Sequence, residues 1–234
     1  MPDPAMPDPA MPDPAPLKIT TRSGNVRVVV GAPGEFAVVG GTIERRDDGT
    51  VHIRREPSSN SIEVRCAPGT DVTVGTASGK VELIGALGAV RVATVSGRIR
   101  VDEGTRIDVR TKSGKIEIGT CAGDCRIMSK SSAVHVRKAG RVTVAGVSGV
   151  VFLEDVGGAE VKTVSGKVAV GSTGNDRISV HTVSGKVDVR LPSATRPSAR
   201  LRSLSGRVNC ELAPGDDCEV AVVSVSGAIK VSSG

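Results

Sequence analysis

Hydrophobic and polar residues alternate over short stretches along most of this chain. Runs such as Val-Arg-Val at 90–92 and Val-Ala-Val at 168–170 place an aliphatic side chain at every second position. A period of two is typical of β-strands with one buried face, and glycine or serine bounds most of the runs. The pattern therefore predicts an all-β chain built from many short strands.

A Ser-Gly dipeptide divides residues 78–234 into similar units, with Ser131-Ser132 filling the one gap in the series. The clearest copies read Thr-Val-Ser-Gly-Lys-Val-x-Val, at 163–170 and 182–189, and each unit holds two short strands and two turns. Successive units are 17 to 21 residues apart, and the dipeptides begin at Ser78, Ser96, Ser113, Ser148, Ser165, Ser184, Ser205 and Ser226.

A unit of this size cannot enclose a core alone, but stacked copies can. Each strand then pairs with the equivalent strand of the next coil about 4.8 Å away, and the inward valines line up. The repeat predicts a β-solenoid, similar to a parallel β-helix, with two short strands per 17–21-residue coil. The composition agrees, because 29 Gly supply tight turns and a narrow interior has no room for rings: the chain has two Phe and no Tyr or Trp.

The chain divides into three predicted parts. Residues 1–16 hold three copies of Met-Pro-Asp-Pro-Ala and predict a disordered, Pro-rich tail. Residues 17–75 predict irregular N-terminal coils that act as a cap, with a hairpin at Asp48-Gly49. Residues 76–234 predict the regular solenoid. Its last strands, around Val225 to Val231, have no later element to cover them, so we expect an edge there that is free to pair.

Charge and hydropathy restrict the location and the partners. No run reaches the 18 apolar residues of a membrane helix, and the N-terminus lacks the regions of a secretory signal. We therefore predict a cytoplasmic protein without integral membrane association. The formal net charge of +6 permits an anionic partner, although base stacking on aromatic rings is nearly excluded.

The five cysteines are interpreted as small core residues, because most lie two positions from an aliphatic residue. They are Cys66, Cys121, Cys125, Cys210 and Cys218. Cys121 and Cys125, with three residues between them, leave open half of a metal site or a redox pair, but no second pair of ligands with suitable spacing accompanies them.

No residue pattern indicates catalysis. The tripeptide Ser-Gly-Lys is explained by the repeat, since no phosphate-loop motif surrounds it and no helix pattern follows. His52, His135 and His181 fall in separate coils without a neighbouring nucleophile and orienting acid. We predict that the protein is not an enzyme and has no catalytic residue, no metal and no cofactor.

Aligning the coils on Ser-Gly places the outward side chains in columns. One column, the basic file, consists of Lys80, Arg98, Lys115, Lys167, Lys186 and Arg207. The basic file could follow a polyanion, although acidic residues are interspersed beside it. In the middle of this face the charges give way to a predicted contact patch formed by Ala133, His135, Val150, Phe152 and Ala169. A shifted register that buries Phe152 is the alternative.

The repeated units are similar to those of a known family. Asp48–Ile53, Ile62–Val64, Ala67–Val72, Thr76–Val81 and the later Thr-Val-Ser-Gly-Lys-Val units resemble the bacterial putative adhesin family of β-strand repeats, whose function is unknown. The resemblance covers residues 17–234 and implies a β-solenoid without catalytic residues to transfer. A weaker resemblance in design, a short tail on an uncapped solenoid, is to the bactofilins, which polymerise.

Together these features predict a non-enzymatic β-solenoid scaffold or binding module. The predicted partner is the protein itself, end to end or face to face, or another protein. Two alternatives remain, an adhesive or carbohydrate-active β-helix and a polyanion-binding surface.

Overall fold

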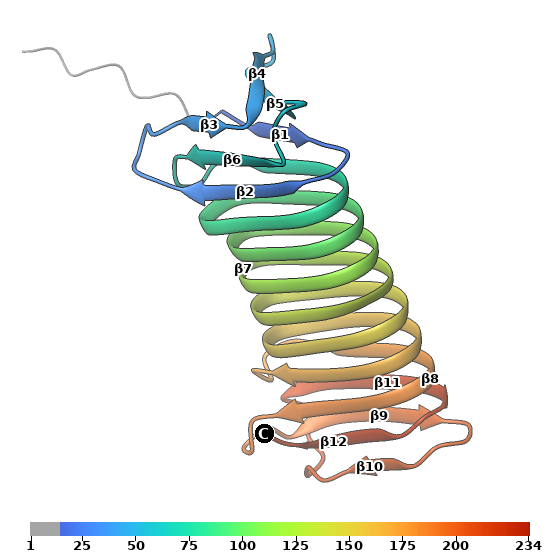
Figure 1. Ribbon diagram of the computed structural model, residues 1–234. Helices are drawn as coiled ribbons and strands as arrows, with labels where there is room; N and C mark the ends of the chain where they lie inside the picture. Colours follow the sequence, from blue (N-terminus) through green and yellow to red (C-terminus); the bar gives the residue numbers. More distant parts are fainter. Residues whose placement is uncertain (1–14) are drawn as a thin grey trace, which may run out of the picture.

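The computed structural model describes residues 15–234, so the predicted tail lies outside the described residues except for Ala15 and Pro16. The described chain is all β and winds into a tall, solenoid-like stack (Figure 1), which confirms the predicted all-β, solenoid-like class. Its strands are β1 (Leu17–Thr20), β2 (Asn25–Val30), β3 (Ala37–Val39), β4 (Gly41–Arg45), β5 (Val51–Arg55), β6 (Ser61–Cys66), β7 (Val72–Ser172), β8 (Ile178–Leu191), β9 (Pro197–Ser203), β10 (Val208–Cys210), β11 (Cys218–Ser226) and β12 (Ile229–Ser233).

The long element β7 forms the middle of the stack and winds through several coils without a break (Figure 1). Its alternate residues point inward, so that valine, isoleucine and leucine side chains from successive coils build one continuous core. Where β7 meets β8, the pairing is parallel and joins equivalent positions of the repeat, such as Lys167 with Lys186 and Val168 with Val187. The repeat therefore sets which side chains face the core.

Glycine is required at the Ser-Gly corner because adjacent coils approach closely there. Gly166 has a φ of 127°, and a Cβ built on it would lie 1.9 Å from the carbonyl oxygen of Gly149 in the coil before. Beside this corner a threonine hydroxyl binds the turn. Thr111 Oγ1 donates to the carbonyl oxygen of Ser113 at 2.9 Å, and Thr94 and Thr163 repeat the contact in other coils.

At the N-terminal end the order of the coils differs from the order of the sequence. Strands β1 and β2 lie between the start of β7 and the later strands β5 and β6. Two antiparallel strands then cover this end, β4 on β5 and β3 on β6. The hairpin predicted at Asp48-Gly49 is confirmed, because Thr42 pairs with Arg54 across it.

The C-terminal end shows the same exchange. Strand β11 lies between β8 and β9, and β12 lies between β8 and β10. The expectation that the strands around Val225 to Val231 are uncovered is therefore wrong. The loops at 192–196 and 211–217 are long enough to carry the chain past one coil and back, so the outermost coil is 197–210 instead.

The outermost coil explains a second correction. Cys210 is exposed and is not a core residue, because its strand β10 has a neighbour on one side only. The other four cysteines are buried, as predicted. Leu204 in the same coil is 85% exposed. The stack thus has a covered N-terminal end and a C-terminal end with a free strand edge.

Candidate functional site

Phe152 lies on the outer surface of β7. It is 39% exposed, whereas its neighbours Val151 and Leu153 are buried. This is the outward register, and the alternative that buries Phe152 is wrong. Val150 is also exposed, at 48%, although aliphatic side chains in this fold are mostly buried. Side chains alternate between the two faces of a strand, and both neighbours of Phe152 fill the core. The ring of Phe152 is therefore presented to solvent.

His135, from the preceding coil, packs against Phe152. The two ring centroids are 5.1 Å apart and the planes are tilted by 53°, a geometry typical of favourable aromatic pairs. His135 Nε2 lies 2.7 Å from Glu154 Oε1. The imidazole is therefore held from two sides.

Glu154 was missed in the sequence analysis, although a signal existed. It lies two positions after Phe152, in the next outward column, and 19 residues after His135. One repeat of 17 residues plus one strand period gives this spacing. The contact patch thus includes an acid beside its imidazole.

The structure brings the patch residues onto one face of β7. Ala133 and Val150 occupy equivalent positions in successive coils: each is exposed and directly precedes a buried valine. Ala169, in the following coil, is half-buried. Their small side chains leave the rings of His135 and Phe152 as the most prominent groups of the patch.

Two surface hollows flank this pair of rings. One has a volume of about 380 Å³, and its lining includes Phe152, Glu154, Ala169, Gly171, Asp188 and Arg190. The other has a volume of about 250 Å³, and its lining includes Arg100, Asp102, Glu117, Gly119, His135 and Arg137. Each hollow is lined by one of the two rings and carries charged groups of both signs.

A glycine lines each hollow, and alanine cannot replace it easily. A Cβ on Gly171 would lie 2.1 Å from the carbonyl oxygen of Glu154, and a Cβ on Gly119 would lie 2.3 Å from that of Asp102. Close approach of the backbones therefore imposes a residue without a side chain at both positions.

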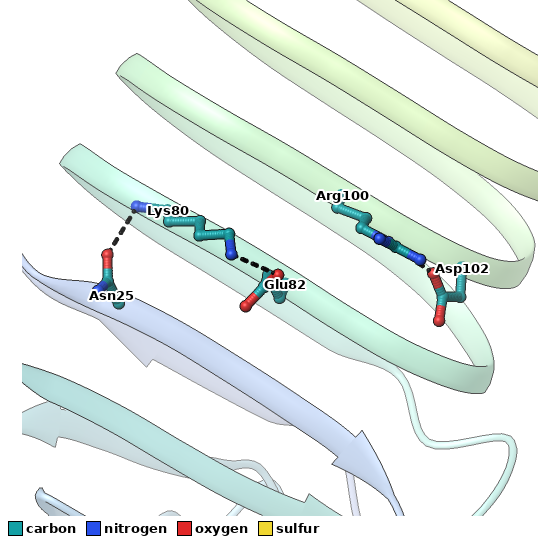
Figure 2. A network of polar contacts seen from close by, with 5 residues as sticks. All are labelled: Asn25, Lys80, Glu82, Arg100 and Asp102. Carbon is teal, nitrogen blue, oxygen red and sulfur yellow. Dashed lines mark hydrogen bonds and ion pairs between the residues drawn. The ribbon is translucent and has the colours of Figure 1, made fainter.

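The basic file lies beside the contact patch but is partly neutralised. Lys80 Nζ is 2.7 Å from Glu82 Oε1, and the backbone nitrogen of Lys80 donates to Asn25 Oδ1 at 3.2 Å (Figure 2). Lys115 pairs in the same way with Glu117, and Lys186 with Asp188. Figure 2 also shows that Arg100 pairs with Asp102, at 3.1 Å, in the next coil.

The file is also interrupted near its end. Arg98, Lys115, Lys167 and Lys186 are exposed in coils of β7 and β8. Because β12 is inserted between β8 and β10, Arg207 does not follow Lys186 directly. The register places Ala228 between them.

The two neighbouring cysteines lie in the core at one corner of β7. A hydrogen bond between the thiols lowers the pKa of Cys121, and the same bond together with burial raises the pKa of Cys125. Both are free and buried. Within residues 15–234, no group of three or more His, Cys, Asp or Glu side chains is arranged to hold a metal ion.

In the part of the chain that the structure describes, no helix has the length and apolar character that crossing a bilayer needs.

Comparison with known proteins identifies a family over nearly the whole chain. The model of the Toastrack DUF4097 family matches residues 16–232. Among the curated proteins, none matches the chain. A solved structure of a putative adhesin from Bacteroides fragilis is 12% identical, with 92% of this chain and 91% of that one covered and a TM-score of 0.47. A putative cell adhesion protein from Clostridium sporogenes is 12% identical over 94% and 93%, with a TM-score of 0.20.

Proposed function

The chain belongs to the Toastrack DUF4097 family, as the resemblance of its repeats predicted, and on this basis we propose that it is a non-enzymatic scaffold that binds another protein. The proposed contact surface is the patch of Ala133, His135, Val150, Phe152 and Ala169. The observation that carries the proposal is the exposed Phe152, one of only two aromatic residues other than histidine, held against His135 between two hollows.

The geometry of the patch suits protein recognition. Anchors of protein interfaces are enriched in aromatic and arginine side chains that lie in well-packed surroundings. Phe152 and His135 are already ordered by their mutual packing and by Glu154, so little side-chain entropy is lost on binding. The hollows on both sides can accept partner side chains, and Arg137 and Arg190 lie in their walls.

We expect Phe152→Asp to weaken partner binding strongly without loss of the fold. Truncating an interface anchor typically costs about 2 kcal/mol or more, which corresponds to roughly 30-fold weaker binding. Cross-linking mass spectrometry in the native cell, followed by affinity measurement with each identified partner, would detect this. The matched control is Val164→Asp, which changes a 47% exposed valine outside the patch. Equal affinity of both variants and the unchanged protein would refute the patch.

Self-association through the C-terminal edge is a second candidate, and the free edge of the outermost coil favours it. In this coil Leu204 is 85% and Val208 is 41% exposed. The opposite end is covered by β3 and β4, so a head-to-tail contact is obstructed. Two C-terminal ends related by a two-fold axis would instead pair their outer strands antiparallel, as a closed dimer.

We expect light scattering of the concentrated protein to show a dimer that Leu204→Lys converts to a monomer. Arg202 and Arg207 belong to the outermost coil, 197–210, together with Arg200, which lies 3.7 Å from Glu219. This coil has no acidic residue of its own, so each copy presents an excess of positive charge to the other. Added salt should therefore strengthen the dimer. A monomer at every concentration and salt level would exclude this contact.

The remaining interpretations have less support. The ion pairs of Lys80, Lys115 and Lys186 weaken the case for a polyanion along the basic file. A carbohydrate-active β-helix usually offers aromatic platforms to sugar rings, and the chain has two Phe. The 17–21-residue coil with two strands, the three-part division of the chain and the cytoplasmic location stay predictions. Fractionation of cells that produce the tagged chain would test the location.

A further inference from the structure

A cavity lies at the covered N-terminal end of the stack, beside the turn between β6 and β7. Its volume is about 590 Å³, which is larger than either hollow beside Phe152 and within the range of pockets that hold small ligands. Its lining comes from four segments that are separate in the sequence, 15–17, 33–36, 45–51 and 66–70. The way the chain covers this end of the stack therefore creates the cavity.

The floor of this cavity is the apolar end of the core. Leu17, Val51 and Cys66 line it and are buried, and Phe36, which is 38% exposed, forms part of the wall. The buried hydroxyl of the lining, that of Thr70, is already engaged, because it donates to a backbone carbonyl of its own turn at 2.7 Å. The floor therefore offers hydrocarbon surface to an occupant.

The pairing of β4 with β5 directs an arginine toward this apolar floor. Arg45 lies directly opposite Val51 in the hairpin, and opposed residues of antiparallel strands project from the same face. Because Val51 faces the core, the side chain of Arg45 extends on the side of the cavity. Arg46, the next residue, also lines the cavity. Among residues 15–234, neither arginine makes an ion pair.

The acids near these arginines are held by other partners. Glu35, in the lining, accepts a hydrogen bond from a backbone nitrogen of its own loop at 3.0 Å and lies 3.4 Å from Arg65 Nη1. Asp48, at the tip of the hairpin, accepts a hydrogen bond from the backbone nitrogen of Thr50 at 2.9 Å. These contacts lower the pKa of both carboxyl groups, and Arg46 adds a smaller effect on Asp48. With two arginines and one glutamate, the lining keeps an excess of one positive charge.

We propose that this cavity binds a single-chain fatty acid. The hydrocarbon chain packs on Leu17, Val51 and Cys66, and the carboxylate accepts hydrogen bonds from the guanidinium groups of Arg45 and Arg46, which match its planar geometry. The excess of one positive charge in the lining suits a singly charged carboxylate rather than a doubly charged phosphate. This inference is independent of the proposed contact patch, which lies on β7.

Isotope labelling of the phenylalanine rings tests the proposal in the full-length chain, which has only two of them. On titration with dodecanoate below its micelle concentration, we expect the nuclear magnetic resonance signals of the Phe36 ring to shift to saturation while those of Phe152 stay unchanged. Octanoate should bind at least about tenfold more weakly, because each buried methylene group contributes about fourfold in affinity. No shift at Phe36, or equal shifts of both rings, would overturn the proposal.

Charge variants test which residues hold the carboxylate. Arg45→Gln with Arg46→Gln should weaken dodecanoate binding about tenfold or more, since hydrogen bonds to charged groups are lost. The matched control is Lys18→Gln with Arg54→Gln, which removes the same charge from β1 and β5 outside the cavity lining. Unchanged Phe152 ring signals report an intact fold in each variant. Equal affinity of the two double variants would refute the role of the arginine pair.

Two further probes test the head group. Dodecan-1-ol has the same hydrocarbon chain without the charge, and dodecyl phosphate carries a larger charge. We expect both to bind the unchanged protein more weakly than dodecanoate does. An equal affinity for the alcohol would show that the arginines do not recognise the head group, and tighter binding of the phosphate would replace the fatty acid by a lipid phosphate. Either result would overturn the proposal.

Discussion

Replacing Gly166 with alanine is expected to destabilise the protein by about 3 kcal/mol or more. Two costs combine at this residue. Its φ of 127° lies in a region that side chains other than glycine rarely adopt, at a cost of about 1–3 kcal/mol. The new Cβ would also lie 1.9 Å from the carbonyl oxygen of Gly149, so the coils must separate, at a further cost of about 1–3 kcal/mol.

Chemical denaturation followed by far-ultraviolet circular dichroism would measure this effect, and two alanine variants provide controls. Gly49→Ala shares a positive φ, of 79°, but nothing lies within 4 Å of its Cβ, so we expect a loss of about 1 kcal/mol. Gly75→Ala has neither problem and should change stability by less than about 1 kcal/mol. If Gly166→Ala lost no more stability than Gly49→Ala, the close approach of adjacent coils at this corner would be refuted.

The period of two and the Ser-Gly spacing predicted the all-β, solenoid-like class and an outward position for Phe152, with a shifted register that buries this residue left open as the alternative. Both follow from local pattern, because a residue between two buried aliphatic neighbours on a strand must face outward. The spacing also predicted that Lys167 and Lys186 are neighbours. The choice between core-facing and outward positions depends on periodicity alone and survives any order of the coils. The neighbours within a column depend on that order, since Ala228 lies between Lys186 and Arg207.

The order of the coils at both ends could not be predicted in this way. One Val-x-Val strand pairs as well with one copy of the unit as with another, so the repeat does not specify which coil lies next to which. Loop length decides instead, as at 211–217 before β11. The cavity of about 590 Å³ beside Phe36 at the N-terminal end was missed for a related reason, since four segments that are separate in the sequence line it.

A chain that ends at Asp217 is expected to lose the order of two coils, although it lacks only one. Strand β9 pairs with β11, and β10 pairs with β12, in the part of the chain that the structure describes. Removing β11 and β12 leaves β9 and β10 without these neighbours. The parallel backbone hydrogen bonds between these strands are lost. A backbone hydrogen bond outside the strands, donated by the nitrogen of Ser205 to the carbonyl oxygen of Val225 at 3.0 Å, is lost as well.

Hydrogen exchange followed by mass spectrometry separates this outcome from a stack in sequence order. We expect peptides covering 199–210 to exchange at the rate of unstructured chain in the shortened protein, while peptides of β7 keep their protection. A chain lacking only Ser233 and Gly234 is the matched control and should stay protected at 199–210. If β9 could move onto the free edge of β8, 199–203 would remain protected, and the inserted order would not be needed for stability. Because the core of a solenoid is a sum of contacts between neighbouring coils, losing the inserted coil removes two such interfaces at once.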